Sequence, residues 1–274
     1  VFMRQNDSRL EAPSAPNVVQ GLGSLNYVVP TELVELPSKG ILYPSDHPLY
    51  NKEYVEIKHM TAKEEDILTS LNLIEKGVVL DYLIQSLLIN KDINCKNLLA
   101  GDRSAILLNA RMNGYGADYK FKLNCSKCSE EIEVECNLAE IKNKEIDASI
   151  NDSGLMTLEL PKTKYPVTLR FLTDHEEEVL QKEIEKRKNM GFSNESTTIF
   201  LQFIVISING VKNEGNSLVE FIQNMPSLDA KYIKTQYAQS KPDIDFSIDF
   251  QCSGCGHPER REVPLTAQFF WPES

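Results

Sequence analysis

The sequence lacks the short motifs that mark common catalytic and nucleotide-binding sites. It contains no Gly-x-Gly-x-x-Gly, no phosphate-binding loop, no Gly-x-Ser-x-Gly and no His-Glu-x-x-His. Only four histidines are present, and they are scattered along the chain. We therefore expect that the protein is not an enzyme.

Long apolar runs and an excess of basic residues are also missing. The longest apolar stretch, around residues 204–208, is far shorter than the roughly eighteen residues that a membrane-spanning helix needs. Residues 1–7 lack the continuous apolar core of a secretory signal, so we expect a reducing cytosol. Lysine and arginine number 29 against 40 aspartates and glutamates, and the net charge of −11 disfavours nucleic acid as a partner.

Two Cys-x-x-Cys pairs are the strongest signal that is present. Each pair lies between two runs in which every second residue is apolar, which is the pattern of half-buried strands. Each therefore predicts a hairpin whose turn carries two thiols, similar to the knuckle of a zinc ribbon. The pairs are Cys125 with Cys128 and Cys252 with Cys255.

Four thiolates are the tetrahedral set that Zn²⁺ accepts, and neither hairpin has four alone. We therefore expect Cys125, Cys128, Cys252 and Cys255 to bind one structural Zn²⁺ together, with their sulfurs within about 4 Å of one another. The main alternative is a disulfide within each pair. A thioredoxin-like redox site is less favoured, because such motifs open a helix whereas these lie between strands.

Other segments repeat along with the cysteines. Thr61 and Thr173 each begin a Thr-x-x-Glu-Glu sequence at the end of a strand-like run, which predicts a capping box at a helix N-terminus. Asp102 precedes Asp229 by the same 127 residues that separate Cys125 from Cys252. The sequence thus predicts an α+β fold that is internally duplicated. Its two pseudo-two-fold-related repeats would each hold strands, helices and a knuckle hairpin, and would share one zinc site.

The pattern divides the chain into five segments. We expect an extended N-terminal arm at 1–33, repeat one at 34–138, a linker at 139–157, repeat two at 158–265 and an aromatic C-terminal tail at 266–274. Each repeat should contain an apolar helix, at 78–89 and at 199–208, although the second of these segments also fits a strand. The offset between the repeats grows from 112 residues at the two threonines to 127 at the cysteines, and the charged stretch at 181–188 is a natural place for part of this insertion.

One further set of segments carries a family resemblance. Residues 36–44 read Leu-Pro-Ser-Lys-Gly-Ile-Leu-Tyr-Pro, and they are followed by Met-Thr-Ala-Lys-Glu-Glu-Asp-Ile-Leu at 60–68 and Gly-Asp-Arg at 101–103. With Gly-Tyr-Gly at 114–116, these segments resemble the baseplate proteins of T-even-type bacteriophages. The resemblance is good over residues 34–138 and weaker in the second repeat.

The resemblance implies a structural component of a contractile-tail baseplate hub, assembled in the host cytoplasm and located in the virion. Its partners would be other baseplate and tail proteins. An assembly chaperone that is absent from the mature virion is the first alternative, and an intracellular zinc-ribbon protein that binds nucleic acid is the second. We further expect the N-terminal arm and the aromatic residues Phe269, Phe270 and Trp271 to dock on partners, unless these aromatic residues pack on their own domain.

Overall fold

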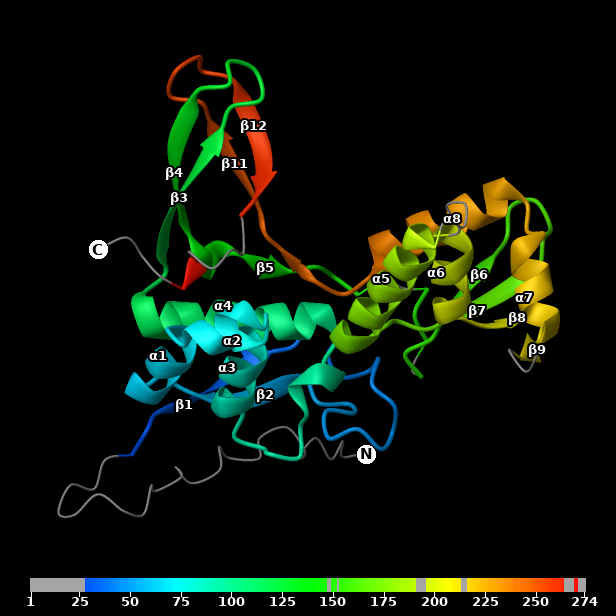
Figure 1. Ribbon diagram of the computed structural model, residues 1–274, viewed down its shortest axis with the longest axis horizontal. Coiled ribbons are helices and arrows are strands. Elements are labelled where there is room, and N and C mark those ends of the chain that lie inside the picture. Colours follow the sequence, from blue (N-terminus) through cyan, green and yellow to red (C-terminus); the bar gives the residue numbers. More distant parts are fainter. Residues whose placement is uncertain are drawn as a thin grey trace, which may run out of the picture.

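The computed structural model describes residues 28–146, 149–151, 153–190, 196–212, 216–263 and 269–270. Helices and strands are mixed along the chain, and the expected α+β class is confirmed. Figure 1 shows two units that each combine a small sheet with helices, and a pair of hairpins that stand above helix α4. None of the helices in the described ranges is both long and apolar enough to cross a lipid bilayer.

The first unit begins with an antiparallel pair of strands. Strands β1 (Thr31–Glu35) and β2 (Tyr54–Lys58) bury Val34, Val55 and Ile57 on one face, as their alternating pattern predicts. Four α-helices follow, with the short 3-10 helix η1 (Cys95–Asn97) before the last of them, and the chain then enters the first hairpin (Figure 1). These helices are α1 (Ala62–Leu68), α2 (Leu71–Glu75), α3 (Val79–Leu87) and α4 (Ala100–Tyr115).

The second unit contains a four-stranded sheet with the order β6-β7-β8-β9. Its strands are β6 (Met156–Glu159), β7 (Pro166–Leu169), β8 (Val205–Ile208) and β9 (Val211–Lys212). Its helices are α5 (Asp174–Asn189), α6 (Ser196–Ile204), α7 (Asn216–Gln223) and α8 (Ser227–Ser240). The ambiguous segment 199–208 is thus a helix up to Ile204 and a strand from Val205, and the charged stretch 181–188 lies in α5.

The two hairpins come from the ends of the two units. Strand β3 (Asp118–Asn124) pairs with β4 (Glu131–Asn137), and β11 (Ser247–Gln251) pairs with β12 (Pro258–Glu262). At their base, β5 (Lys142–Asn143) pairs with β10 (Ile244–Asp245), so the strands leading out of one hairpin and into the other are joined. This pairing holds the hairpins beside each other in Figure 1.

Both expected capping boxes are found at helix N-termini. Thr61 precedes α1, and the carboxylate of Glu64 accepts hydrogen bonds from the Thr61 N–H at 3.0 Å and from its hydroxyl at 2.6 Å. Thr173 precedes α5, where its hydroxyl accepts from the Glu176 N–H at 3.3 Å and its N–H donates to the Glu176 carboxylate at 2.9 Å. The first glutamate of each Thr-x-x-Glu-Glu sequence therefore serves to begin a helix.

The two units share a single hydrophobic core. Buried apolar residues form one cluster that runs from Val34 to Phe270. The units also contact each other through their backbones. Leu99 forms an isolated antiparallel β-bridge with Thr173, and the N–H of Asp174 donates to the Leu98 carbonyl at 2.9 Å. Arg103 of α4 adds ion pairs to Asp81 of α3 and to Asp174 of α5.

The C-terminal aromatic residues correct one expectation. Phe269 and Phe270 are only 1% and 3% exposed. The ring of Phe269 packs edge-on against Tyr119, and its carbonyl accepts a hydrogen bond from the buried Arg111 at 2.6 Å. The expectation that these two phenylalanines dock on partners is therefore wrong, because the chain buries them itself. Trp271 lies outside the described residues.

Candidate metal centre

The first knuckle is a tight turn at the tip of the β3–β4 hairpin. The Cys125 N–H donates to the Glu130 carbonyl at 3.0 Å, and the Cys125 carbonyl accepts from the Ser129 N–H at 2.9 Å. Ser129 adopts a left-handed conformation with φ of 59°, which turns the chain back into β4. The two cysteine side chains are thereby presented on one side of the turn.

The second knuckle repeats the hydrogen bonds of the first, and each equivalent residue lies 127 positions later in the chain. The Cys252 N–H donates to the His257 carbonyl at 3.0 Å, and the Cys252 carbonyl accepts from the Gly256 N–H at 2.8 Å. Gly256 takes the left-handed conformation here, with φ of 68°. The backbone alone therefore builds the same thiol-bearing turn twice.

The fold brings all four predicted cysteines together. Sγ of Cys125 lies 3.8 Å from Sγ of Cys255, and Sγ of Cys128 lies 3.7 Å from Sγ of Cys252. All four sulfurs lie within 4.8 Å of one another, slightly wider than the expected 4 Å. All six cysteines of the chain are free thiols. Neither Cys-x-x-Cys pair therefore forms the disulfide that was the main alternative to a metal site.

The sulfur positions fit a metal with tetrahedral geometry. Four sulfurs at about 2.3 Å from a central Zn²⁺ are separated by about 3.8 Å along each edge of the tetrahedron. The separations of 3.8 and 3.7 Å across the hairpins match that edge, and a modest contraction would bring the remaining sulfur–sulfur distances to it. The four cysteines could therefore bind one metal ion.

The protonation of the thiols is coupled because they are so close. Backbone N–H groups of Cys128 and Lys127 lower the pKa of Cys125 to about 7. The backbone N–H of Glu130 also lowers the pKa of Cys128. Burial and the neighbouring thiols outweigh this effect and raise the pKa of Cys128 to about 12. One sulfur thus ionises easily while its neighbour keeps its proton. A divalent cation would favour the thiolate form of all four.

Two contacts outside the sulfurs hold the knuckles against each other, and the sequence pattern did not indicate either. The Ser126 N–H of the first knuckle donates to the carboxylate of Glu259 on β12 at 3.2 Å. Gly254 of the second knuckle lies against the carboxylate of Glu130, where a Cβ would overlap it. The overlap involves the end of an exposed, flexible side chain, so a larger residue at 254 would require the Glu130 carboxylate to turn away.

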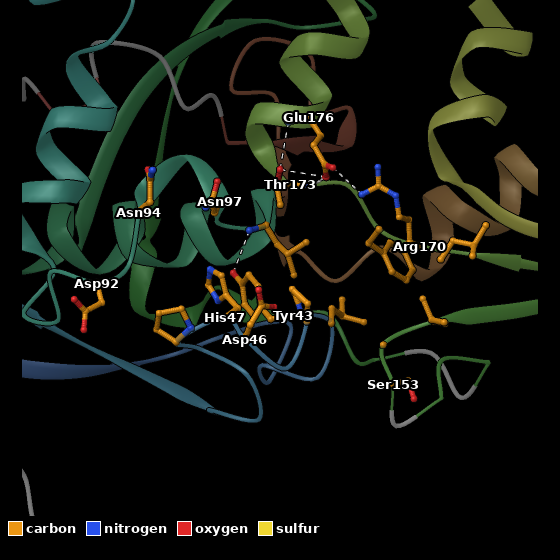
Figure 2. A pocket seen from close by; sticks show the side chains of 18 residues that line it. Tyr43, Asp46, His47, Asp92, Asn94, Asn97, Ser153, Arg170, Thr173 and Glu176 are labelled. Carbon is orange, nitrogen blue, oxygen red and sulfur yellow. Dashed lines mark hydrogen bonds and ion pairs between the residues drawn. The ribbon is translucent and has the colours of Figure 1, made fainter. Parts of the chain in front are cut away.

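A cavity of about 490 Å³ lies between the two units, away from the cysteines. Figure 2 shows Tyr43 and His47 near its centre and Arg170 towards one end. His47 stacks on Tyr43 and its Nδ1 accepts from the Leu49 N–H, while Arg170 pairs at 2.7 Å with the Glu176 carboxylate that caps α5. These polar groups support the fold, and we assign them no catalytic role.

The fold and the sulfur cluster together define an α+β protein with a four-cysteine centre shared by two hairpins. The family model of the T4 bacteriophage base plate protein matches residues 32–271, and the chain belongs to this family. The resemblance seen in the sequence is thus confirmed, and it extends over both units. No curated protein and no solved structure matches the chain.

Membership in this family indicates a structural role in a phage baseplate. It also indicates a place in the tail of the virion, with other phage tail proteins as partners.

Proposed function

We propose that the protein is a structural component of a contractile-tail baseplate hub that contributes protein–protein contacts during tail assembly in the host cytoplasm. The observation that carries this proposal is the cysteine cluster of a baseplate-family chain, which joins hairpins from its two units. A cross-link between units gives a chain of this size one rigid body on which neighbouring subunits can assemble.

In this proposal Cys125, Cys128, Cys252 and Cys255 hold one structural Zn²⁺. Soft thiolate ligands in tetrahedral geometry suit zinc, and four protein ligands leave no position for water or substrate. The ion would therefore fix the two hairpins and supply no catalytic chemistry. Its binding free energy would add to the stability of the folded state.

We further propose that the two units are repeats related by a pseudo-two-fold axis. The first cysteine of each pair contacts the second cysteine of the other, which is the exchange that a two-fold axis produces. The central strands agree, because Ile57 pairs with Leu88 just after α3 and Leu169 pairs with Val205 just after α6.

The buried aspartates of α4 and α8 support the same relation. Asp102 accepts hydrogen bonds from the N–H and the hydroxyl of Ser38, in the turn that follows β1. Asp229 accepts from the N–H groups of Lys162 and Thr163, in the turn that follows β6. Both turns begin with Leu-Pro, and each helix thus holds the corresponding turn of its own unit.

The N-terminal arm is retained as a proposed docking segment for other baseplate proteins. Its first 27 residues lie outside the described ranges, and the proposal rests on their polar, aperiodic sequence. Deletion of residues 1–27 is expected to leave the melting temperature of the isolated protein unchanged and to reduce its incorporation into tails. Unchanged incorporation would remove the arm from the set of contacts.

Mass spectrometry of purified virions and of isolated hub subassemblies tests the proposed function. A hub component is expected in the hub fraction and in the virion at a constant ratio to the other hub proteins. Presence in hub intermediates with absence from the virion would instead assign the chain to assembly chaperones. Presence in the virion with absence from the hub fraction would contradict the hub assignment.

A further inference from the structure

The second unit carries a groove between helices α6, α7 and α8 that the proposed zinc site does not explain. Its volume is about 720 Å³. The floor is apolar and consists of Leu201 of α6, Ile222 of α7 and Met225 just after α7. One long wall is a face of α8.

The wall formed by α8 is long and straight. Residues at 227, 230, 231, 234, 235, 238 and 239 of α8 line the groove, and this spacing of three and four places them on one face of the helix. At about 1.5 Å per residue, this face extends for roughly 18 Å. That length matches about three turns of a second helix lying along the groove.

The charge of the groove is opposite to that of the protein. Among the described residues that line it, the ionisable side chains are Lys231 and Lys234, with no aspartate or glutamate. Both lysines are exposed, and Lys234 reaches across the groove to the hydroxyl of Thr197 at 3.4 Å. A local positive site on a chain with a net charge of −11 favours an acidic partner.

We propose that this groove docks an amphipathic helix of another tail protein. The apolar face of that helix lies on Ala230 and Ala238 of α8, above the buried floor of the groove, and carboxylates along its flank pair with Lys231 and Lys234. Recognition of an amphipathic helix in an apolar groove is a common mode of protein–protein binding. The proposal rests on the proposed function, because it takes the partner from the same tail assembly.

Photo-crosslinking tests the proposal in phage-infected cells, with the full-length chain supplied in place of its natural copy. A benzophenone amino acid at position 238, which is exposed and lines the groove, marks whatever occupies it. The expected crosslinked peptide comes from another tail protein and has acidic residues three or four positions apart beside an apolar stripe. A crosslink to a second copy of this chain, or to a segment without acidic residues, would overturn the proposal.

Charge reversal supplies a matched control. Lys231→Glu with Lys234→Glu is expected to reduce the crosslink yield about tenfold, because two attractive surface pairs become repulsive. Lys63→Glu with Lys76→Glu makes the same change in net charge at exposed positions of the first unit, and the yield should stay unchanged. Equal yields for the two double variants would contradict the proposal.

The two levels of the proposal fail in different ways. If the wild-type chain is absent from tails and from their assembly intermediates, the proposed function itself fails. If the wild-type and the Lys231→Glu, Lys234→Glu chains enter tails equally well, the docking groove fails while the proposed function stands. Both variants should melt at the wild-type temperature, since the four lysines are exposed.

Discussion

Sγ of Cys125 lies 3.8 Å from Sγ of Cys255, although 130 residues separate them in the chain. The reciprocal pair, Cys128 and Cys252, lies 3.7 Å apart. Because each hairpin supplies two of the four sulfurs, the ligand set is complete only when both hairpins are in place. Metal binding and the association of the two hairpins are therefore expected to be thermodynamically linked.

The two buried aspartates give a matched test of the proposed repeats. We expect Asp102→Ala to lower the free energy of unfolding by about 3 kcal/mol and Asp229→Ala by about 2 kcal/mol, because each leaves buried donors without an acceptor. Tyr43→Phe removes one of the hydrogen bonds to Asp102 and also leaves the buried Leu99 N–H without its acceptor, so it should cost about 2 kcal/mol. Urea unfolding of the three variants measures these differences. An Asp229→Ala variant as stable as wild type would argue against equivalent roles.

The capping threonines should contribute equally to stability. Thr61→Ala and Thr173→Ala are each expected to lower the free energy of unfolding by about 1 kcal/mol, because each removes the hydroxyl of a helix N-cap. Thr→Ser at the same positions keeps the hydroxyl and serves as the control. Loss of stability in the serine variants as large as in the alanine variants would show that the hydroxyl is not responsible.

Glu64 predicts a specific acid sensitivity. Burial raises the pKa of Glu64, but hydrogen bonds from Lys58, Ser86 and Thr61 outweigh it and lower the pKa from 4.5 to about 2. A carboxyl group with a lowered pKa stabilises the fold above its unfolded value, and this contribution is lost as the pH falls from about 4.5 towards 2.

The comparison of wild type with Glu64→Gln isolates this effect. We expect the variant to be less stable by about 2 kcal/mol at pH 7, with a difference that shrinks steadily below pH 4.5. Urea midpoints measured between pH 2.5 and pH 7 give the comparison. A difference that stays constant over this range would contradict the assignment of the acid sensitivity to Glu64.

The buried C-terminal phenylalanine should matter to the isolated protein. Phe269→Ala is expected to lower the free energy of unfolding by about 3 to 4 kcal/mol, because it opens a cavity beside Tyr119 and Arg111. Leu228→Ala is the control, since that side chain is 57% exposed and its loss should change the stability by less than about 0.5 kcal/mol. Equal melting curves for the two variants would show that the packing of Phe269 contributes nothing.

The features that the sequence predicted correctly are local ones. A Cys-x-x-Cys turn and a Thr-x-x-Glu cap are determined by residues within one or two turns of each other, so their patterns are readable without the fold. The meeting of the two cysteine pairs at one site was predictable for a different reason. Each hairpin supplies only two of the four ligands that a tetrahedral zinc site needs, so the sequence predicts that the two hairpins meet.

The features that the sequence did not reveal depend on distant partners. Phe269 and Phe270 read as an exposed tail, because no local pattern shows that Arg111 donates to a carbonyl 158 residues away. Asp102 repeats as Asp229 in the sequence, but its contact with the turn at Ser38 requires the packed core. The division of residues 199–208 at Ile204 likewise depends on the pairing of Val205 with Leu169, since the periodicity of a short, continuously apolar run does not distinguish a buried helix from a buried strand.

The metal content of the purified protein tests the shared zinc site most directly. Elemental analysis with X-ray absorption at the zinc edge measures the ion and its ligands together. A shared site predicts one zinc per chain with four sulfur neighbours at about 2.3 Å, and loss of that zinc in Cys252→Ser and Cys125→Ser alike. Cys95→Ser, a thiol outside the cluster, should keep the ion. A protein without zinc, or one that keeps its full zinc in Cys252→Ser, would contradict the shared centre.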